Sequence, residues 1–103
     1  MTDDIDNVPA RGRLAGRRVL VTQADDYMGP ATVALFGAEG AEVVADTRDL
    51  TRPGACEAAI ADAGRVDVLV ANLASPNYSG LTVGEVDDAT WSHAFDVMVH
   101  PLH

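Results

Sequence analysis

The sequence predicts an α/β fold, in which a Rossmann-like, doubly wound parallel sheet is represented by its N-terminal half. Three observations predict it. Short apolar runs rich in valine recur along the chain, and a helical pattern separates each run from the next. The runs are apolar throughout, which is typical of strands covered on both faces. Only three such runs are present, about half of what a complete sheet of this kind needs.

The first strand is expected over 17–22 (RRVLVT), after a polar, mobile arm over residues 1–14. Residues 15–103 are then the N-terminal part of one Rossmann-like domain. A helix is expected to begin near Pro30, because proline suits the first helical turn, and to end at Gly40. Three residues share one face of this helix: Val33, Phe36 and Gly37.

The second buried strand is expected over 41–46 (AEVVAD) and the third over 66–72 (VDVLVAN). Between them lies a helix over about 53–63, for which Thr51 is the expected N-cap and Pro53 an early helical residue. The alternation of strand and helix is the reason for expecting parallel strands.

A loop is expected over 73–80, from its serine, proline, asparagine and glycine content. The segment TVGE (82–85) has the capping-box pattern, Thr followed three residues later by Glu, and a last helix is expected after it. One face of that helix carries Trp91, Phe95, Met98 and Leu102. Pro101 is expected to bend or interrupt it.

The composition limits the possible partners and location. Seven arginines, no lysine and sixteen acidic residues give a net charge of −9, which disfavours nucleic acid and anionic membranes as partners. Cys56 is the single cysteine, so a disulfide framework or a zinc cluster within the chain is excluded, and no metal is expected. The acidic N-terminus is not a signal peptide, and no apolar run reaches the length of a membrane span. A cytoplasmic protein is expected.

The turn after the first strand reads VTQADDYMGP (21–30). It resembles the turn of the short-chain dehydrogenase/reductase family, Thr-Gly-x-x-x-Gly-x-Gly, in which glycines let backbone N–H groups approach a pyrophosphate. The corresponding positions hold Thr22, Gln23, Tyr27 and Gly29, so two of three glycines are replaced by large residues. The phenol ring and the neighbouring carboxylates of residues 25 and 26 are expected to exclude a pyrophosphate, and therefore a nicotinamide cofactor.

The same turn, written Thr-x4-Tyr-x-Gly, resembles that of the halohydrin dehalogenases, possibly their G type. This resemblance implies a halide or nucleophile pocket at Thr22, Tyr27 and Gly29. It also implies a cofactor-independent lyase that converts vicinal haloalcohols to epoxides with release of halide. In reverse, epoxides are opened by azide, cyanide or nitrite. The family's catalytic Ser-x12-Tyr-x3-Arg pattern is absent from these 103 residues, so no catalytic residue is assigned here and the triad is expected downstream. A homotetramer is implied by the same resemblance.

Two further segments bear on the site. The stretch DVLVANLAS (67–75) resembles the dehydrogenases' Asp-x-Leu-Val-Asn-Asn-Ala-Gly, and Asn72 is one of its matches. Since ligands of such sheets bind beyond the carboxyl ends of the strands, the loop residues Ala74, Ser75 and Pro76 are expected to border the substrate. Met98 occupies the position of an asparagine that relays protons in the dehydrogenases.

Other readings of the chain stay open. Asp46 ends the second strand, where an acidic residue would hold an adenosine ribose, as in a divergent NAD(H)-dependent reductase. A catalytically inactive scaffold subunit of the same family is a third possibility. The three histidines, His93, His100 and His103, are expected on a surface or an interface, because no cysteine or carboxylate cluster completes a metal site around them.

Overall fold

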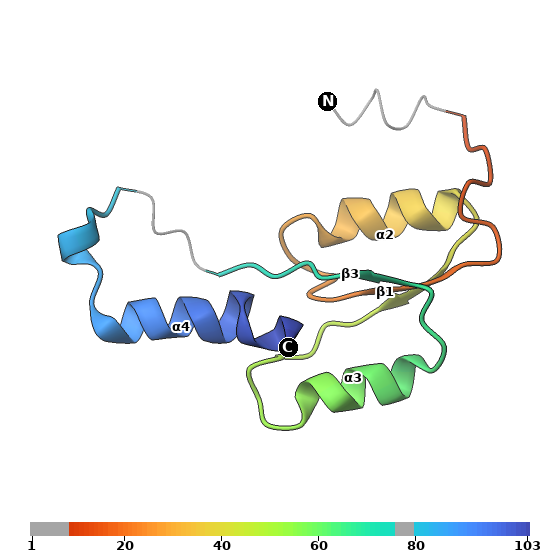
Figure 1. Cartoon of the computed structure of the whole chain (residues 1–103). Coiled ribbons are helices and arrows are strands. Elements are labelled where there is room, and N and C mark those ends of the chain that lie inside the picture. The colour runs from red at the N-terminus through yellow and green to blue at the C-terminus, as the bar shows by residue number, and fades with distance from the viewer. Residues whose placement is uncertain (1–8, 76–79) are drawn as a thin grey trace.

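The computed structural model describes residues 9–75 and 80–103. It is a mixed α/β structure with a three-stranded parallel sheet and a helix on each of its faces (Figure 1). The elements follow in the order β1 (Arg18–Val21), α2 (Gly29–Ala38), β2 (Glu42–Ala45), α3 (Ala55–Ala63), β3 (Val68–Val70), the 3-10 turn η1 (Val83–Glu85), α4 (Asp88–Met98) and the 3-10 turn η2 (His100–Leu102). All three predicted strands are confirmed, each shorter than the sequence suggests. The predicted burial is right for β1 and wrong for β2, because β2 and β3 flank the central strand and are only partly buried.

The strand order is β2-β1-β3, with β1 in the centre. Both pairs are parallel, and Leu20 lies opposite Val44 on one side and Leu69 on the other. The crossovers through α2 and α3 lie on opposite faces of the sheet (Figure 1). Because the three strands are parallel, their carboxyl ends lie at one edge of the sheet, and the segments that follow them form the candidate site there.

The core is centred on β1, whose side chains alternate between the two faces. Val19 and Val21 are fully buried and pack with Val33 and Phe36 of α2. Leu20 points to the opposite face and is 1% exposed. It lines a small apolar cavity of about 60 Å³ together with α3 residues that include Cys56, Ala59 and Ile60. Burial on both faces explains why β1 carries an uninterrupted apolar run.

The helix boundaries refine the sequence predictions. α2 ends before Gly40, as predicted: Gly40 has φ +91°, and the Ala41 N–H donates to the Phe36 carbonyl at 3.1 Å. Gly37 is exposed, whereas Val33 and Phe36 are half-buried and pack against the core.

The expected N-cap of α3 is also wrong. α3 begins at Ala55, and its N-cap is Gly54, at φ +77°. The hydroxyl and the N–H of Thr51 both donate to Asp49 Oδ1, at 2.6 and 3.0 Å. Thr51 therefore closes a local turn instead of capping the helix, because the aspartate two residues earlier competes for its donors.

The capping box opens η1 and not the last helix. Thr82 donates its hydroxyl to the Glu85 carboxylate at 3.0 Å, but the chain is extended again at Val86. α4 begins later, with Asp87 as N-cap: its carboxylate accepts the Thr90 N–H at 2.7 Å. Hydrogen bonds from the side chain of Thr90, first, and from its N–H lower the pKa of Asp87. The helix ends before Pro101, which lies in η2, as expected.

The apolar face predicted on α4 exists and is turned outward. Trp91 and Phe95 lie with their ring centroids 5.5 Å apart. Exposure is 61% for Trp91, 39% for Phe95, 43% for Met98 and 61% for Leu102. The half-buried positions of the helix are instead Thr90, Ala94 and Val97.

The described end of the N-terminal arm is tied to the C-terminus of α2. The buried Glu39 carboxylate accepts the N–H groups of Arg11 and Arg13, at 3.2 and 3.0 Å, and pairs with the Arg13 guanidinium at 3.2 Å. These hydrogen bonds, the Arg13 side chain first, lower the pKa of Glu39 to about 2. The Leu14 N–H adds a bond to the Glu39 carbonyl, at 2.9 Å. Within the predicted arm, the segment from Arg11 onward is thus hydrogen-bonded to the domain.

Candidate functional site

The turn between β1 and α2 donates most of its N–H groups to partners in the chain. The Ala24 N–H donates to the Asp46 carbonyl at 3.0 Å, and the Asp26 N–H to the Gln23 carbonyl at 3.0 Å. The Tyr27 N–H donates to the Asp26 carboxylate at 2.8 Å, and the Gly29 N–H to the Asp26 carbonyl at 2.8 Å. These four donors therefore already have partners within the chain.

The turn keeps a glycine-type backbone at the two positions where its glycines are replaced. Gln23 has φ +41° and Tyr27 has φ +50°, both in the left-handed region that favours glycine. Gly29 is required for a different reason. A Cβ there would lie 2.5 Å from the Ala24 carbonyl oxygen and 2.7 Å from that of Gln23. The close approach of α2 to the turn therefore depends on this glycine.

Asn72 holds the turn from the side of β3. Its side chain is buried, and Nδ2 donates to the carbonyls of Gln23 and Asp26 at 2.9 and 3.0 Å. Its own carbonyl accepts the Thr22 hydroxyl at 2.9 Å. The asparagine at the strand exit thus links the carboxyl ends of β1 and β3.

A second link joins the same two strands. Gln23 Nε2 donates to the Ala74 carbonyl at 3.2 Å, and the Ala74 N–H donates to Gln23 Oε1 at 2.6 Å. The glutamine amide therefore pairs with the main chain of residue 74 in both directions, as a neighbouring peptide group would. We refer to this pair of bonds as the Gln23 clamp.

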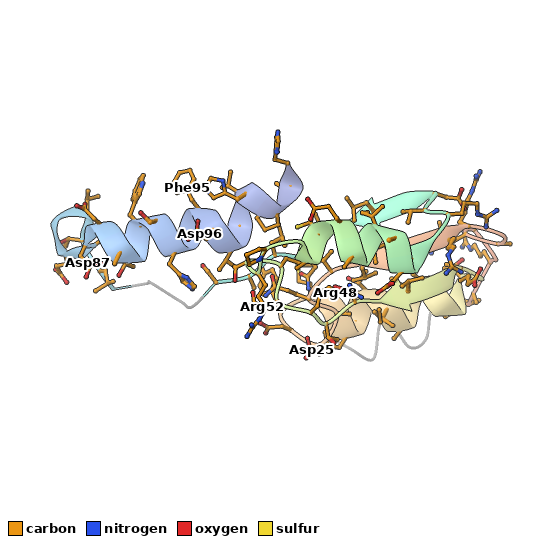
Figure 2. The ribbon with its side chains drawn as sticks, turned by 90° about the horizontal axis from the view of Figure 1, so that it is seen from below. Asp25, Arg48, Arg52, Asp87, Phe95 and Asp96 are labelled. Carbon is orange, nitrogen blue, oxygen red and sulfur yellow. The ribbon has the colours of Figure 1, made fainter. Side chains whose placement is uncertain are left out.

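A pocket of about 420 Å³ opens at the carboxyl edge of the sheet. Its volume is within the range of small-molecule sites. The walls come from the turn after β1, the loop after β2, the exit of β3 and one side of α4. They are formed by Gln23, Asp25, Asp26, Thr47, Arg48, Asp49, Leu50, Thr51, Leu73, Ala74, His93 and Val97. Figure 2 shows Asp25, Arg48 and Arg52 at this end of the sheet, whereas Asp87, Phe95 and Asp96 lie along α4.

The pocket lining is acidic. It holds three carboxylates, those of Asp25, Asp26 and Asp49, against the single guanidinium of Arg48. That guanidinium is already paired, through Nη2 with Asp62 at 2.9 Å and through Nε with Asp46 at 2.6 Å. The hydrogen bonds that Arg48 donates to Asp62 and Asp46 raise the pKa of Arg48. Hydrogen bonds from Thr51 lower the pKa of Asp49, which keeps this wall of the pocket negatively charged.

Asp46 directly follows β2 and is 7% exposed. Its Oδ1 accepts from Arg48, whereas its Oδ2 is buried and has no hydrogen-bond partner within the part of the chain that the structure describes. An unpaired buried carboxylate oxygen is costly, and such groups often mark a place where a ligand donates.

The three residues expected to form a halide pocket lie close together in sequence, and none of them lines the 420 Å³ pocket. Thr22 is buried, with its hydroxyl donated to the Asn72 carbonyl. Gly29 is buried against the turn. The Tyr27 side chain is 72% exposed and does not contribute to the walls of the 420 Å³ pocket.

Of the three expected substrate-loop residues, Ala74 lines the pocket. The Ser75 hydroxyl donates to Met98 Sδ at 3.2 Å, so the loop contacts α4. Pro76 lies outside the described residues. Sequence reasoning missed the roles of Gln23 and Arg48. A polar residue at a glycine position was a signal for Gln23, whereas the partners of Arg48 depend on the fold.

Two further observations concern metal binding and membrane-spanning helices. Within 9–75 and 80–103, no group of three or more histidine, cysteine or acidic residues is placed to bind a metal ion. None of the helices in these ranges combines the length and the apolar character needed to cross a bilayer. His93 lines the pocket, and His100 lies 3.8 Å from the Asp96 carboxylate on α4.

Comparison of the sequence with models of known protein families finds no family that matches.

Proposed function

We propose that this chain is the N-terminal part of a Rossmann-like, doubly wound domain that dehalogenates vicinal haloalcohols without a cofactor. Its products are an epoxide, a halide ion and a proton, and in reverse it opens epoxides with small anions such as azide, cyanide or nitrite. The observation that carries the proposal is the turn at residues 22–29. It keeps the glycine-type backbone, while four of its N–H groups donate to partners within the chain.

The site fits a dinucleotide poorly. A pyrophosphate needs free N–H donors or cations, but four N–H groups of the turn are donated internally and Arg48 is paired with two carboxylates. Asp25 and Asp26 would repel its charge at short range. The Gln23 clamp also places a side chain where the glycine of the dehydrogenases leaves backbone exposed. These three features support chemistry that needs no nicotinamide.

The reaction requires a base that takes the hydroxyl proton of the haloalcohol. The alkoxide oxygen then bonds to the neighbouring carbon as the carbon–halogen bond breaks, and the halide leaves with the bonding electrons. The resemblance assigns the base to a tyrosine whose pKa an arginine lowers, with a serine holding the same oxygen. Ser75, Tyr78 and Arg65 do not have the required spacing, so the proposal requires these groups elsewhere in the polypeptide.

In this proposal, Tyr27 forms one wall of the halide site. Its ring is exposed at the N-terminal end of α2, where the helix dipole favours negative charge. An aromatic edge is polarisable and suits a weakly hydrated anion better than a pyrophosphate. The proposal also includes the uncharged haloalcohol or epoxide as the occupant of the adjacent pocket, and a homotetrameric, cytoplasmic enzyme.

Halide release from a small chlorohydrin by the full-length protein tests the proposal. We expect release without added nucleotide, and no change in NADH fluorescence on titration. Tyr27→Phe is the matched control, since it keeps the ring and should retain halide release. Tyr27→Ala removes the ring and should weaken inhibition by added bromide. Nucleotide binding without halide release would overturn the proposal.

One structural feature favours a second candidate, a divergent NAD(H)-dependent reductase. The buried Asp46 Oδ2 has no partner among the described residues, and the pocket nearby is open. A ribose hydroxyl is a suitable donor to such an oxygen. The NADH titration separates the two candidates, and a protein that neither binds NADH nor releases halide would be a scaffold subunit.

A further inference from the structure

Gln23 has an unfavourable backbone conformation and an unusual side-chain partner. Its φ of +41° is in the region where glycine is the unstrained residue. Strained conformations persist where the surrounding structure enforces them, and they cluster at functional sites. Here the enforcing contacts are visible: the Gln23 carbonyl accepts Asn72 Nδ2 at 2.9 Å, and the side-chain amide forms the clamp to Ala74.

The clamp controls a wall of the 420 Å³ pocket. Gln23, Leu73 and Ala74 all line that pocket. β3 ends at Val70, and beyond it the loop has no neighbouring strand to accept or donate its main-chain hydrogen bonds in the described structure. The glutamine amide provides both of these bonds for residue 74, one in each direction. A side chain from the turn after the neighbouring strand β1 therefore helps to hold the loop in position.

We propose that Gln23 is a positioning residue, which fixes the Leu73–Ser75 loop as the substrate-facing wall of the pocket. This role rests on the proposed function for its substrate, a small haloalcohol or epoxide. Gln23 touches the loop and need not touch the reacting atoms. Loss of the clamp would let the wall move, so substrate binding would weaken more than the chemical step.

Three variants of the full-length protein test the role. Gln23→Gly removes the clamp and relieves the positive φ, so the cost of the two lost hydrogen bonds is partly offset. Gln23→Asn keeps the amide but is one methylene too short to reach residue 74. Gln23→Glu keeps an oxygen that accepts the Ala74 N–H but loses the donor to the Ala74 carbonyl.

The direct measurement is hydrogen exchange of the Ala74 amide by NMR. We expect the Ala74 amide to exchange roughly five- to tenfold faster in Gln23→Gly and Gln23→Asn, because this is the change in rate that corresponds to loss of one intramolecular hydrogen bond. The exchange rate should change less in Gln23→Glu, which keeps the acceptor of this N–H. KM for the chlorohydrin should rise severalfold in the first two variants, with a smaller change in kcat. Thermal unfolding of each variant shows that the fold is intact.

Unchanged exchange at Ala74 in Gln23→Gly would overturn the clamp itself. Faster exchange with unchanged KM would overturn its positioning role. If the unsubstituted protein releases no halide, the proposed function fails, and the clamp is then judged by the exchange measurement alone.

Discussion

Replacement of Gly29 by alanine should destabilise the protein severely. Gly29 is the first residue of α2 and lies against the turn that follows β1. A Cβ at this position would lie 2.5 Å from the Ala24 carbonyl oxygen, 2.6 Å from the Ala24 carbonyl carbon and 2.7 Å from the Gln23 carbonyl oxygen. All three atoms belong to the backbone, so no side chain can rotate to make room.

The expected cost follows from these distances. To restore an ordinary contact, α2 or the turn must move by about 1 Å, because non-bonded atoms pack best at roughly 3.5 Å or more. Such overpacking costs about 1–3 kcal/mol. The shift also breaks or lengthens the bond from the Gly29 N–H to the Asp26 carbonyl, 2.8 Å long, a further loss of about 1 kcal/mol. We therefore expect a loss of about 3 kcal/mol in the free energy of unfolding.

Gly37→Ala in the same helix is the matched control. Nothing lies within 4 Å of a Cβ built on Gly37, which is exposed. Alanine there should stabilise the protein by about 0.5–1 kcal/mol through helix propensity. Urea unfolding followed by circular dichroism measures both variants, and at a typical m-value a 3 kcal/mol loss lowers the midpoint by about 1.5 M. A Gly29→Ala protein as stable as the unsubstituted one would refute the steric reasoning.

Three other predictions concern the turn and the N-terminal arm. Tyr27→Gly should be more stable to urea than Tyr27→Ala by about 1 kcal/mol, because both lose the ring but only glycine relaxes the φ of +50°; equal stability would contradict this. Asn72→Leu should cost about 2–4 kcal/mol on chemical unfolding, since it leaves two turn carbonyls without their donor, and a loss below 1 kcal/mol would count against it. The pKa of Glu39 is lowered to about 2 in the folded state, so its contribution is complete above its ordinary pKa near 4.5 and is lost as the pH falls toward 2. The stability gap between the unsubstituted protein and Glu39→Gln should therefore shrink over that range in pH-dependent unfolding, and a constant gap would disprove the linkage.

The order and type of the elements are determined locally, and the sequence was sufficient to predict them. Each strand is a short apolar run. The central strand β1 is buried because α2 and α3 cover opposite faces of the sheet, whereas β2 and β3 are only partly buried. Gly40 ends α2 because its φ of +91° suits glycine alone. These signals act within a few residues, so a pattern along the chain is enough to read them.

The site depends on contacts between segments that are distant in sequence, and only the tertiary structure decided it. The Gln23 clamp reaches 51 residues along the chain to Ala74, and the Asn72 amide reaches 49 back to the Gln23 carbonyl. Sequence identifies two missing glycines, but not that their backbone conformation survives or that Tyr27 faces outward. The Gln23 and Asn72 side chains find their partners because the parallel register of β1 and β3 brings the carboxyl ends of the two strands together. This register is a pairing between segments far apart in sequence, so the residues around either side chain do not determine it.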